Sequence, residues 1–203
     1  YYMLVLDLFC GTKSLKPIIE NKGWEYIGLD IETKFNPDIN IDFLNWDYKT
    51  IKPDMIWASP DCSCYSLASG NRHFNADRTP KTDKCIIHLK ILEKLKECIN
   101  YHLEQNPDLI YFIENPTARM SWFIKEYPRY DVSYCKYGCD RMKPTTIWTN
   151  KVGFIPKKCK NNNPDCDHVR APRGSKTGTQ GIKKEDRYKV PEALILELFS
   201  NSI

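Results

Sequence analysis

Short apolar runs alternate with helical patterns as far as residue 150, and this alternation limits the possible folds more than any other feature of the chain. Helical spacing of apolar residues appears at 15–23 and over the longer stretch 83–104. Strands that alternate with helices favour a mostly parallel sheet with helices on both faces. The sequence therefore predicts an α/β fold. The main apolar runs are residues 3–9, 24–31, 53–59 and 109–115.

The remaining segments predict smaller elements around this core. A short strand and turn are expected at 38–47, and a pair of later strands at 130–135 and 145–150. A helix over 190–200 would start at Pro191, since proline suits the first helical position. A chain of 203 residues is the size of one domain. We expect three parts: an α/β core at 1–150, a loop-rich basic lobe at 151–189, and a helix within 190–203 that packs back on the core.

Reactive side chains follow several of the predicted strands. Asp7, Asp30, Cys62 and Glu114 would meet at one edge, because ligands bind beyond the carboxyl ends of parallel strands. Asp30 lies 23 residues after Asp7, close to the interval of about 20 residues at which an acid meets ribose hydroxyls. The turn between them holds only Gly11, which favours a cofactor with a ribose but no pyrophosphate, such as S-adenosylmethionine. An ordinary α/β turn with an acid at a strand end remains the alternative.

The stretch "IWASPDCSCYSLASG" places Cys62 in a polar loop after a predicted strand. Its thiol could be a nucleophile, a metal ligand, half of a disulfide or an inert packing group. Nine cysteines without a secretory leader indicate reduced thiols in an intracellular protein, and no run is long enough to span a membrane. A carboxyl group at Glu114 and a cation at Arg141 or Lys143 would suit a cysteine nucleophile. Cys64 is interpreted as a packing residue.

Five segments carry a resemblance to a known family. They are "LDLFCGT", "GLDI", "IWASPDCSCYS", "FIENP" and "YGCDRMKPTTIWTN", and the end of the chain adds "APRGSKTGTQG" and "RYKVPEAL". In this order they resemble the C5-cytosine DNA methyltransferase family, and more closely its compact phage and viral members. The resemblance spans nearly the whole chain. It implies a Rossmann-like S-adenosylmethionine-dependent methyltransferase fold, with double-stranded DNA as the partner.

The resemblance also implies roles for individual residues. The residues implied to bind S-adenosylmethionine are Asp7, Phe9, Cys10, Gly11, Asp30, Ile31, Asp42, Phe43 and Pro60. Cys62 falls on the nucleophile that adds to C6 of a flipped-out cytosine, and Glu114 on the acid that holds N3. Either Arg141 or Lys143 would hydrogen-bond O2, because the register of the late motif is ambiguous. The methyl group would then pass to C5.

The chain also departs from the family pattern. Asp61 stands where the family has a proline before the nucleophile, and an anion there would raise the pKa of the thiol. We therefore expect Asp61 to point away from Cys62 or to cap the helix that follows. The short lobe at 151–189 predicts a minimal recognition loop, hence a short target, low selectivity or a helper protein. RNA as the substrate, and a catalytically inactive nucleic-acid-binding protein, remain alternatives.

A second group of soft ligands lies in the predicted lobe. Cys159, Cys166 and His168 could bind a structural zinc ion, with Cys135 or Cys139 as the fourth ligand. A lobe with few apolar residues would gain from such a staple. The spacing matches no standard zinc finger, so surface thiols and a DNA-facing histidine are the alternative.

Overall fold

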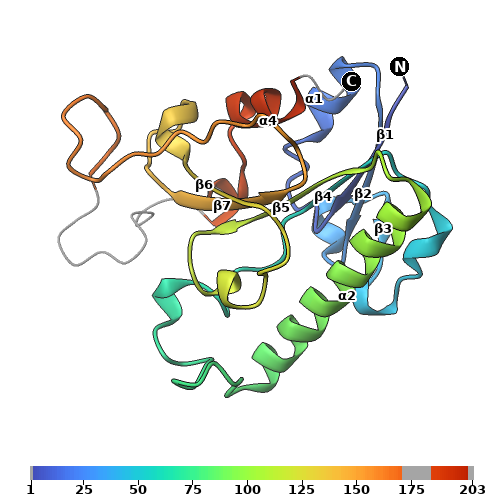
Figure 1. Cartoon of the computed structure of the whole chain (residues 1–203), viewed down its shortest axis with the longest axis horizontal. Helices are drawn as coiled ribbons and strands as arrows, with labels where there is room; N and C mark the ends of the chain where they lie inside the picture. Colours follow the sequence, from blue (N-terminus) through green and yellow to red (C-terminus); the bar gives the residue numbers. More distant parts are fainter. Residues whose placement is uncertain (1, 171–183, 201–203) are drawn as a thin grey trace.

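The computed structural model describes residues 2–170 and 184–200. At its centre lies a seven-stranded sheet with the order β3-β2-β1-β4-β5-β7-β6 (Figure 1). The strands are β1 (Leu4–Leu8), β2 (Glu25–Asp30), β3 (Ile39–Asn40), β4 (Met55–Ala58), β5 (Ile110–Pro116), β6 (Arg129–Ser133) and β7 (Pro144–Thr149). The strands β1 to β5 pair in parallel, whereas β7 runs antiparallel to β5 and to β6. The predicted α/β class with a mostly parallel, Rossmann-like sheet is confirmed.

The central strands are apolar because both of their faces are covered. β1 lies between β2 and β4, with Leu6 opposite Ile27 on one side and Ile56 on the other. Every residue of β4 is buried. Such strands read as continuous apolar runs rather than as an alternating pattern, which is why the sequence located them.

The long helix α2 (Asp83–Gln105) covers one face of the sheet (Figure 1, green). It begins where the Thr82 hydroxyl accepts a hydrogen bond from the backbone N–H of Cys85 at 3.3 Å, an N-cap that satisfies one free donor. Its buried residues recur at helical spacing and pack into the core beneath the strands. They are Cys85, His88, Leu92, Leu95, Cys98, Ile99 and His102.

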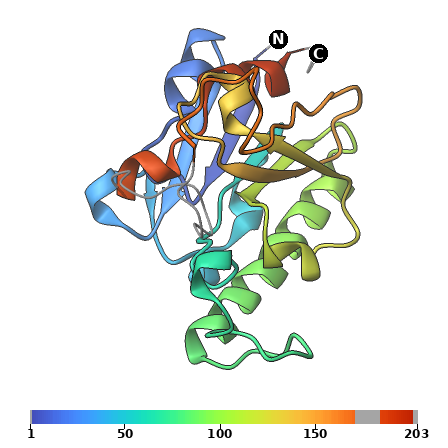
Figure 2. The same ribbon diagram turned by 90° about the vertical axis from the view of Figure 1, so that its left-hand side faces the viewer.

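Two shorter helices cover the opposite face: α1 (Lys16–Asn21) and α4 (Glu192–Phe199) (Figures 1 and 2). The Phe199 ring of α4 lies 6.2 Å from the Trp57 ring of β4 and 5.7 Å from the Phe112 ring of β5, between ring centroids. These aromatic contacts fix the C-terminal helix against the two middle strands.

The segment after β7 is mostly irregular. Residues 155–170 contain no helix or strand, as predicted. Among its described residues, the predicted lobe contains one element that the sequence did not reveal, the short helix α3 (Lys184–Tyr188), because a single turn is too short to show a helical period. The rest of the lobe, 171–183, falls outside the described residues. No helix in the described ranges is long and apolar enough to cross a membrane.

Candidate active site

A cavity of about 210 Å³ opens at the carboxyl ends of β1, β2 and β4, beside α2. Among its lining residues are five that the sequence assigned to the cofactor: Phe9, Ile31, Asp42, Phe43 and Pro60. Isoleucine and histidine side chains of α2 close its other side. The other hollow, on the outer face of α2, contains none of the predicted site residues. The cavity is therefore the structural candidate for the cofactor site.

Phe9, directly after β1, adopts a backbone conformation that is rare for a bulky residue. Its φ is +62°, in the left-handed region, and Gly11 two residues later has φ +47°. The Phe9 ring meets the Phe43 ring edge-on, with centroids 5.1 Å apart. Such strain persists only where the surroundings fix it, and it concentrates at ligand-binding loops. The turn after β1 is thus shaped to present an aromatic wall to the cavity.

Asp30, the last residue of β2, holds that turn in place. Its carboxylate accepts hydrogen bonds from the backbone N–H of Gly11 at 2.9 Å and of Glu32 at 2.8 Å. Leu29 and Ile31, on either side of it, line the cavity. Since each carboxylate oxygen has a second lone pair, Asp30 can still accept from a ligand hydroxyl.

Two predicted cofactor residues have their side chains elsewhere. Asp7 lies one residue inside β1, which ends at Leu8, so its carboxyl group is not at the edge of the sheet as expected. It is buried and accepts a hydrogen bond from the Tyr26 hydroxyl at 2.9 Å, and burial raises its pKa to about 7. The thiol of Cys10 is also buried and does not line the cavity. Side chains alternate between the two faces of a strand, and the Asp7 side chain lies on the face opposite to α2.

Cys62 lies in the loop after β4, half-buried. The loop is tied to β5, because the Asn115 side chain donates a hydrogen bond to the Pro60 carbonyl at 2.8 Å. Burial, followed by the charges of Asp61 and Glu114, raises the pKa of Cys62 to about 11, and Lys143 acts in the opposite direction. The thiol is therefore protonated near neutral pH in the free protein.

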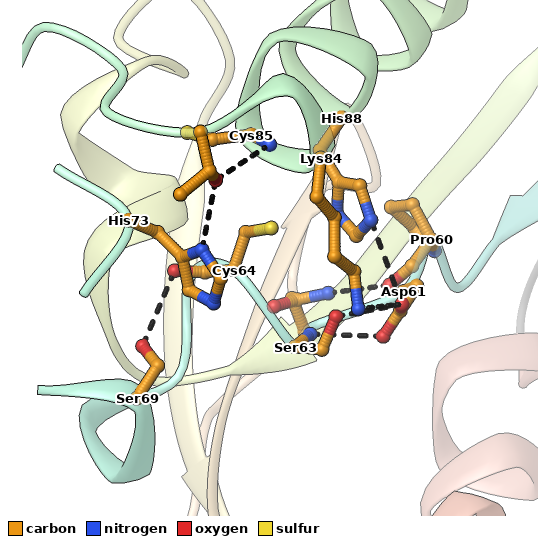
Figure 3. Close-up of polar contacts among 11 residues, drawn as sticks. Pro60, Asp61, Ser63, Cys64, Ser69, His73, Lys84, Cys85 and His88 are labelled. Atoms are coloured by element: carbon orange, nitrogen blue, oxygen red, sulfur yellow. Dashed lines mark hydrogen bonds and ion pairs between the residues drawn. The ribbon is translucent and has the colours of Figure 1, made fainter.

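Asp61 turns its carboxylate toward the next turn and toward α2 (Figure 3). It accepts hydrogen bonds from the backbone N–H and the hydroxyl of Ser63, at 2.8 and 2.7 Å. His88 and Lys84 approach the same carboxylate to 3.6 and 3.7 Å. Burial acts to raise the pKa of Asp61, but these hydrogen bonds and cations outweigh it and lower the pKa. The loop thus keeps its anion by capping and pairing it, although the cap is on a turn where a helix was expected.

Glu114 is buried at the point where β5 leaves β4 and continues beside β7. It accepts a hydrogen bond from the Tyr134 hydroxyl at 2.7 Å. The ammonium group of Lys143 lies 4.4 Å from the centre of the Tyr134 ring and donates to the Arg187 carbonyl at 2.7 Å. Lys143 therefore belongs to the group that contains Cys62 and Glu114.

The Nε of the other candidate cation, Arg141, lies 3.9 Å from the carboxylate of the adjacent Asp140 and has no hydrogen-bond partner within the described chain. Arg141 is not among the charges named as acting on the pKa of Cys62. Cys64 is fully buried in the core beneath α2, as predicted for a packing residue.

Sequence reasoning missed several residues of this site. Tyr134 looked like an ordinary aromatic residue of a late strand, and no local signal linked it to Glu114. Tyr188 in α3 belongs here too: burial, Asp61 and Cys62 raise its pKa. In the sequence, His88 showed only the helical spacing that is expected of a packing residue.

The predicted soft ligands also come together, away from the cavity. One ligand atom from each of Cys135, Cys159, Cys166 and His168 lies within 4.8 Å of all the others. Cys139, the other candidate for the fourth ligand, is not part of this group.

Comparison with known proteins identifies the family. No protein-family model matches the chain. A protein of Frog virus 3 (isolate Goorha) named "Probable DNA (cytosine-5)-methyltransferase" is 35% identical over 214 residues, which cover 97% of this chain and 98% of the viral protein. The chain belongs to the DNA (cytosine-5)-methyltransferase family. The resemblance drawn from its motifs is thereby confirmed.

Solved methyltransferase structures show a more distant similarity to this family member. Entamoeba histolytica methyltransferase EhMeth matches 79% of the chain with a TM-score of 0.46 and 17% identity. The Dnmt2 methyltransferase of S. pombe matches 76% with a TM-score of 0.48 and 12% identity. The matched parts cover 57% and 50% of those two solved chains.

Proposed function

We propose that this chain transfers a methyl group from S-adenosylmethionine to C5 of cytosine in double-stranded DNA, inside the cell. One observation carries the proposal. Cys62, Glu114 and Lys143 gather beside a cavity lined by the predicted cofactor residues, in a chain of the cytosine-5 methyltransferase family. A thiol, a carboxyl group and a cation are the groups needed to activate a pyrimidine ring toward methylation.

The cavity suits an adenosine. Phe9, Phe43 and Ile31 provide apolar walls on which a purine can pack, and Asp42 offers a carboxylate for an exocyclic amino group. Asp42 is already oriented, because its Oδ1 caps the next turn by accepting from the Leu44 N–H at 2.9 Å. When bound there, S-adenosylmethionine supplies the methyl group that the cytosine receives.

Cys62 would open the reaction on a cytosine flipped out of the duplex, since C6 is unreachable within the base stack. After its thiol proton passes to solvent, the sulfur forms a bond to C6, and the ring electrons shift toward N3, where Glu114 donates a proton. Lys143 donates a hydrogen bond to O2. C5 then becomes nucleophilic and takes the methyl group, which leaves S-adenosylhomocysteine, and N3 returns its proton to Glu114. A base removes the C5 proton, the C5–C6 double bond re-forms, and the C6–sulfur bond breaks to release Cys62.

The raised pKa of Cys62 fits this sequence of steps. In the free protein the charges of Asp61 and Glu114 oppose the thiolate, next to burial. The thiol proton must therefore leave Cys62 before the sulfur can bond to C6, and burial and these charges hold it in place in the free protein.

A zinc ion is proposed as a second, structural cofactor, held outside the cavity by the cysteine and histidine group. The basic lobe at 151–189 is proposed to face the DNA phosphates. Its small size favours a short target or a helper protein. RNA remains the second candidate substrate, because the same site would act on any exposed cytosine.

Labelled methyl transfer tests the proposal. The protein is incubated with S-adenosylmethionine carrying a labelled methyl group and with duplex DNA or RNA of the same sequence. We expect label in 5-methylcytidine nucleosides from the DNA, identified by mass spectrometry after digestion. Label only in RNA would show that RNA, not DNA, is the substrate. Label in neither nucleic acid would refute the proposed activity.

A further inference from the structure

Four side chains that take no part in the proposed reaction form a compact set of soft ligands: Cys135, Cys159, Cys166 and His168, here called the Cys3His cluster. Their ligand atoms all lie within 4.8 Å of one another. The His168 Nδ1 faces two of the sulfurs, at 3.2 Å from Cys166 Sγ and 3.7 Å from Cys159 Sγ. The cluster draws its ligands from two parts of the chain that are far apart in sequence.

We propose that the Cys3His cluster binds one structural zinc ion and thereby holds the catalytic carboxyl group in position, a role that rests on the proposed function. Three thiolates and an imidazole nitrogen make a closed tetrahedral zinc site. With zinc–sulfur bonds of about 2.3 Å, tetrahedral geometry puts the sulfurs about 3.8 Å apart, which is compatible with ligand atoms that all lie within 4.8 Å of one another. Cys135 is thus the fourth ligand, and Cys139 is not.

The segment that carries three of the ligands has no regular secondary structure to hold its shape. From residue 155 to residue 170 it has no helix or strand (Figure 1, orange), and His168 is its one buried side chain. Hydrogen bonds and ion pairs attach it to its surroundings; two of these hydrogen bonds reach β6, from the Ser133 N–H to the Lys157 carbonyl and from the Cys159 N–H to the Ser133 hydroxyl, both 2.9 Å. A segment without a core of its own needs a cross-link, and a metal provides one.

A single peptide bond links a residue of the Cys3His cluster to a residue of the candidate active site. Cys135 follows Tyr134 in the short turn η6 (Tyr134–Tyr137), and the Tyr134 hydroxyl donates to Glu114 at 2.7 Å. A metal bound at Cys135 would fix this turn and hence the hydroxyl that orients the carboxyl group. The cofactor cavity lies on other strands and on α2, so metal loss should leave it intact.

Metal analysis of the purified full chain, prepared with a reducing agent, gives the first test. We expect about one equivalent of zinc per chain in the wild type. Cys135→Ser should lose most of it, whereas Cys139→Ser, a matched change four residues away, should keep it. Less than about half an equivalent in the wild type, or equal zinc in the two variants, would overturn the proposal. If Cys135→Ser does not fold, Cys166→Ser in the exposed segment takes its place in the comparison.

Removal of zinc tests the link to catalysis. We expect chelation to lower kcat for methyl transfer by at least about tenfold, while the Kd for S-adenosylmethionine stays the same. Zinc should restore the rate. Unchanged kcat after complete zinc removal would overturn the positioning role. A protein that binds one zinc but never methylates DNA would instead refute the proposed function and leave the metal site standing.

Discussion

At the scale of single residues, Asp61 is the least expected residue of the site, because an anion beside a nucleophilic thiol disfavours the thiolate. Asp61 raises the pKa of Cys62, yet its own carboxylate is held by Ser63 and faces His88 and Lys84. The anion therefore has a local structural role, as a cap of the turn that carries the thiol and as a link to α2. As a consequence, the thiol of Cys62 has a higher pKa in the free protein.

Asp61→Asn should make Cys62 more acidic. Asparagine keeps the capping oxygen but removes the negative charge, so the pKa should fall from its value of about 11, by up to about one unit. The pH dependence of Cys62 alkylation, followed by mass spectrometry of its peptide, measures this. In the wild type the rate should climb with pH toward 11, and in the variant the rise should begin at lower pH.

Asp83→Asn is the matched control, because Asp83 is an exposed acid at the start of α2 that is not among the charges acting on Cys62. Its alkylation curve should overlie that of the wild type. Identical curves for all three proteins would show that Asp61 does not set the thiol pKa.

The cation of the site is a second question at this scale. Lys143→Gln should reduce kcat by about tenfold or more, because one donor of transition-state stabilisation is lost and the pKa of Cys62 rises. Arg141→Gln removes the same charge from a residue that is not among the charges acting on Cys62, and should have a much smaller effect. Steady-state methyl transfer by both variants decides the register of the late motif. A larger loss in the Arg141 variant would reverse the assignment.

At the scale of elements, one contact couples α2 to the wall of the cofactor cavity. The ammonium group of Lys94 donates to the carbonyls of Leu44 and Trp46, at 2.8 and 2.6 Å. Leu44 belongs to the short turn η2 (Phe43–Asn45), and Trp46 follows it. The Phe43 side chain of the same turn lines the cavity. The helix thus supports the predicted adenine site from behind.

Lys94→Met should weaken S-adenosylmethionine binding by about tenfold, because two charged hydrogen bonds to the turn are lost while the aliphatic stem is kept. Lys90→Met changes an exposed lysine one turn earlier on the same helix and should bind the cofactor like the wild type. Calorimetric Kd values compare the two. Equal affinities would mean that η2 keeps its position without α2.

At the scale of the whole molecule, the sheet was predictable because central parallel strands must be apolar throughout. The runs that give β1, β2, β4 and β5 were visible for that reason, and the topology then brought Asp30, Cys62 and Glu114 to one edge. Asp7 was misplaced by a single residue, since an apolar run does not show where pairing ends. Long-range side-chain contacts such as Tyr134 with Glu114 leave no local pattern, so only the structure could reveal them.

The sequence alone did not show which side chains come together in the folded chain. Motif order alone could not choose between Lys143 and Arg141, or between Cys135 and Cys139. In both cases the fold favours one candidate, because β6 and β7 return beside β5, with Lys143 against the Tyr134 ring and Cys135 in the Cys3His cluster.

The central claim is that Cys62 attacks C6 of cytosine, and covalent trapping tests it most directly. Duplex DNA carrying 5-fluorocytosine is incubated with the protein and S-adenosylmethionine, then analysed by denaturing electrophoresis. Fluorine cannot leave as the C5 proton does, so the adduct should persist with the wild type. The matched Cys64→Ala variant should also form it, and Cys62→Ala should not. An undiminished adduct with Cys62→Ala, or none with the wild type, would contradict the account.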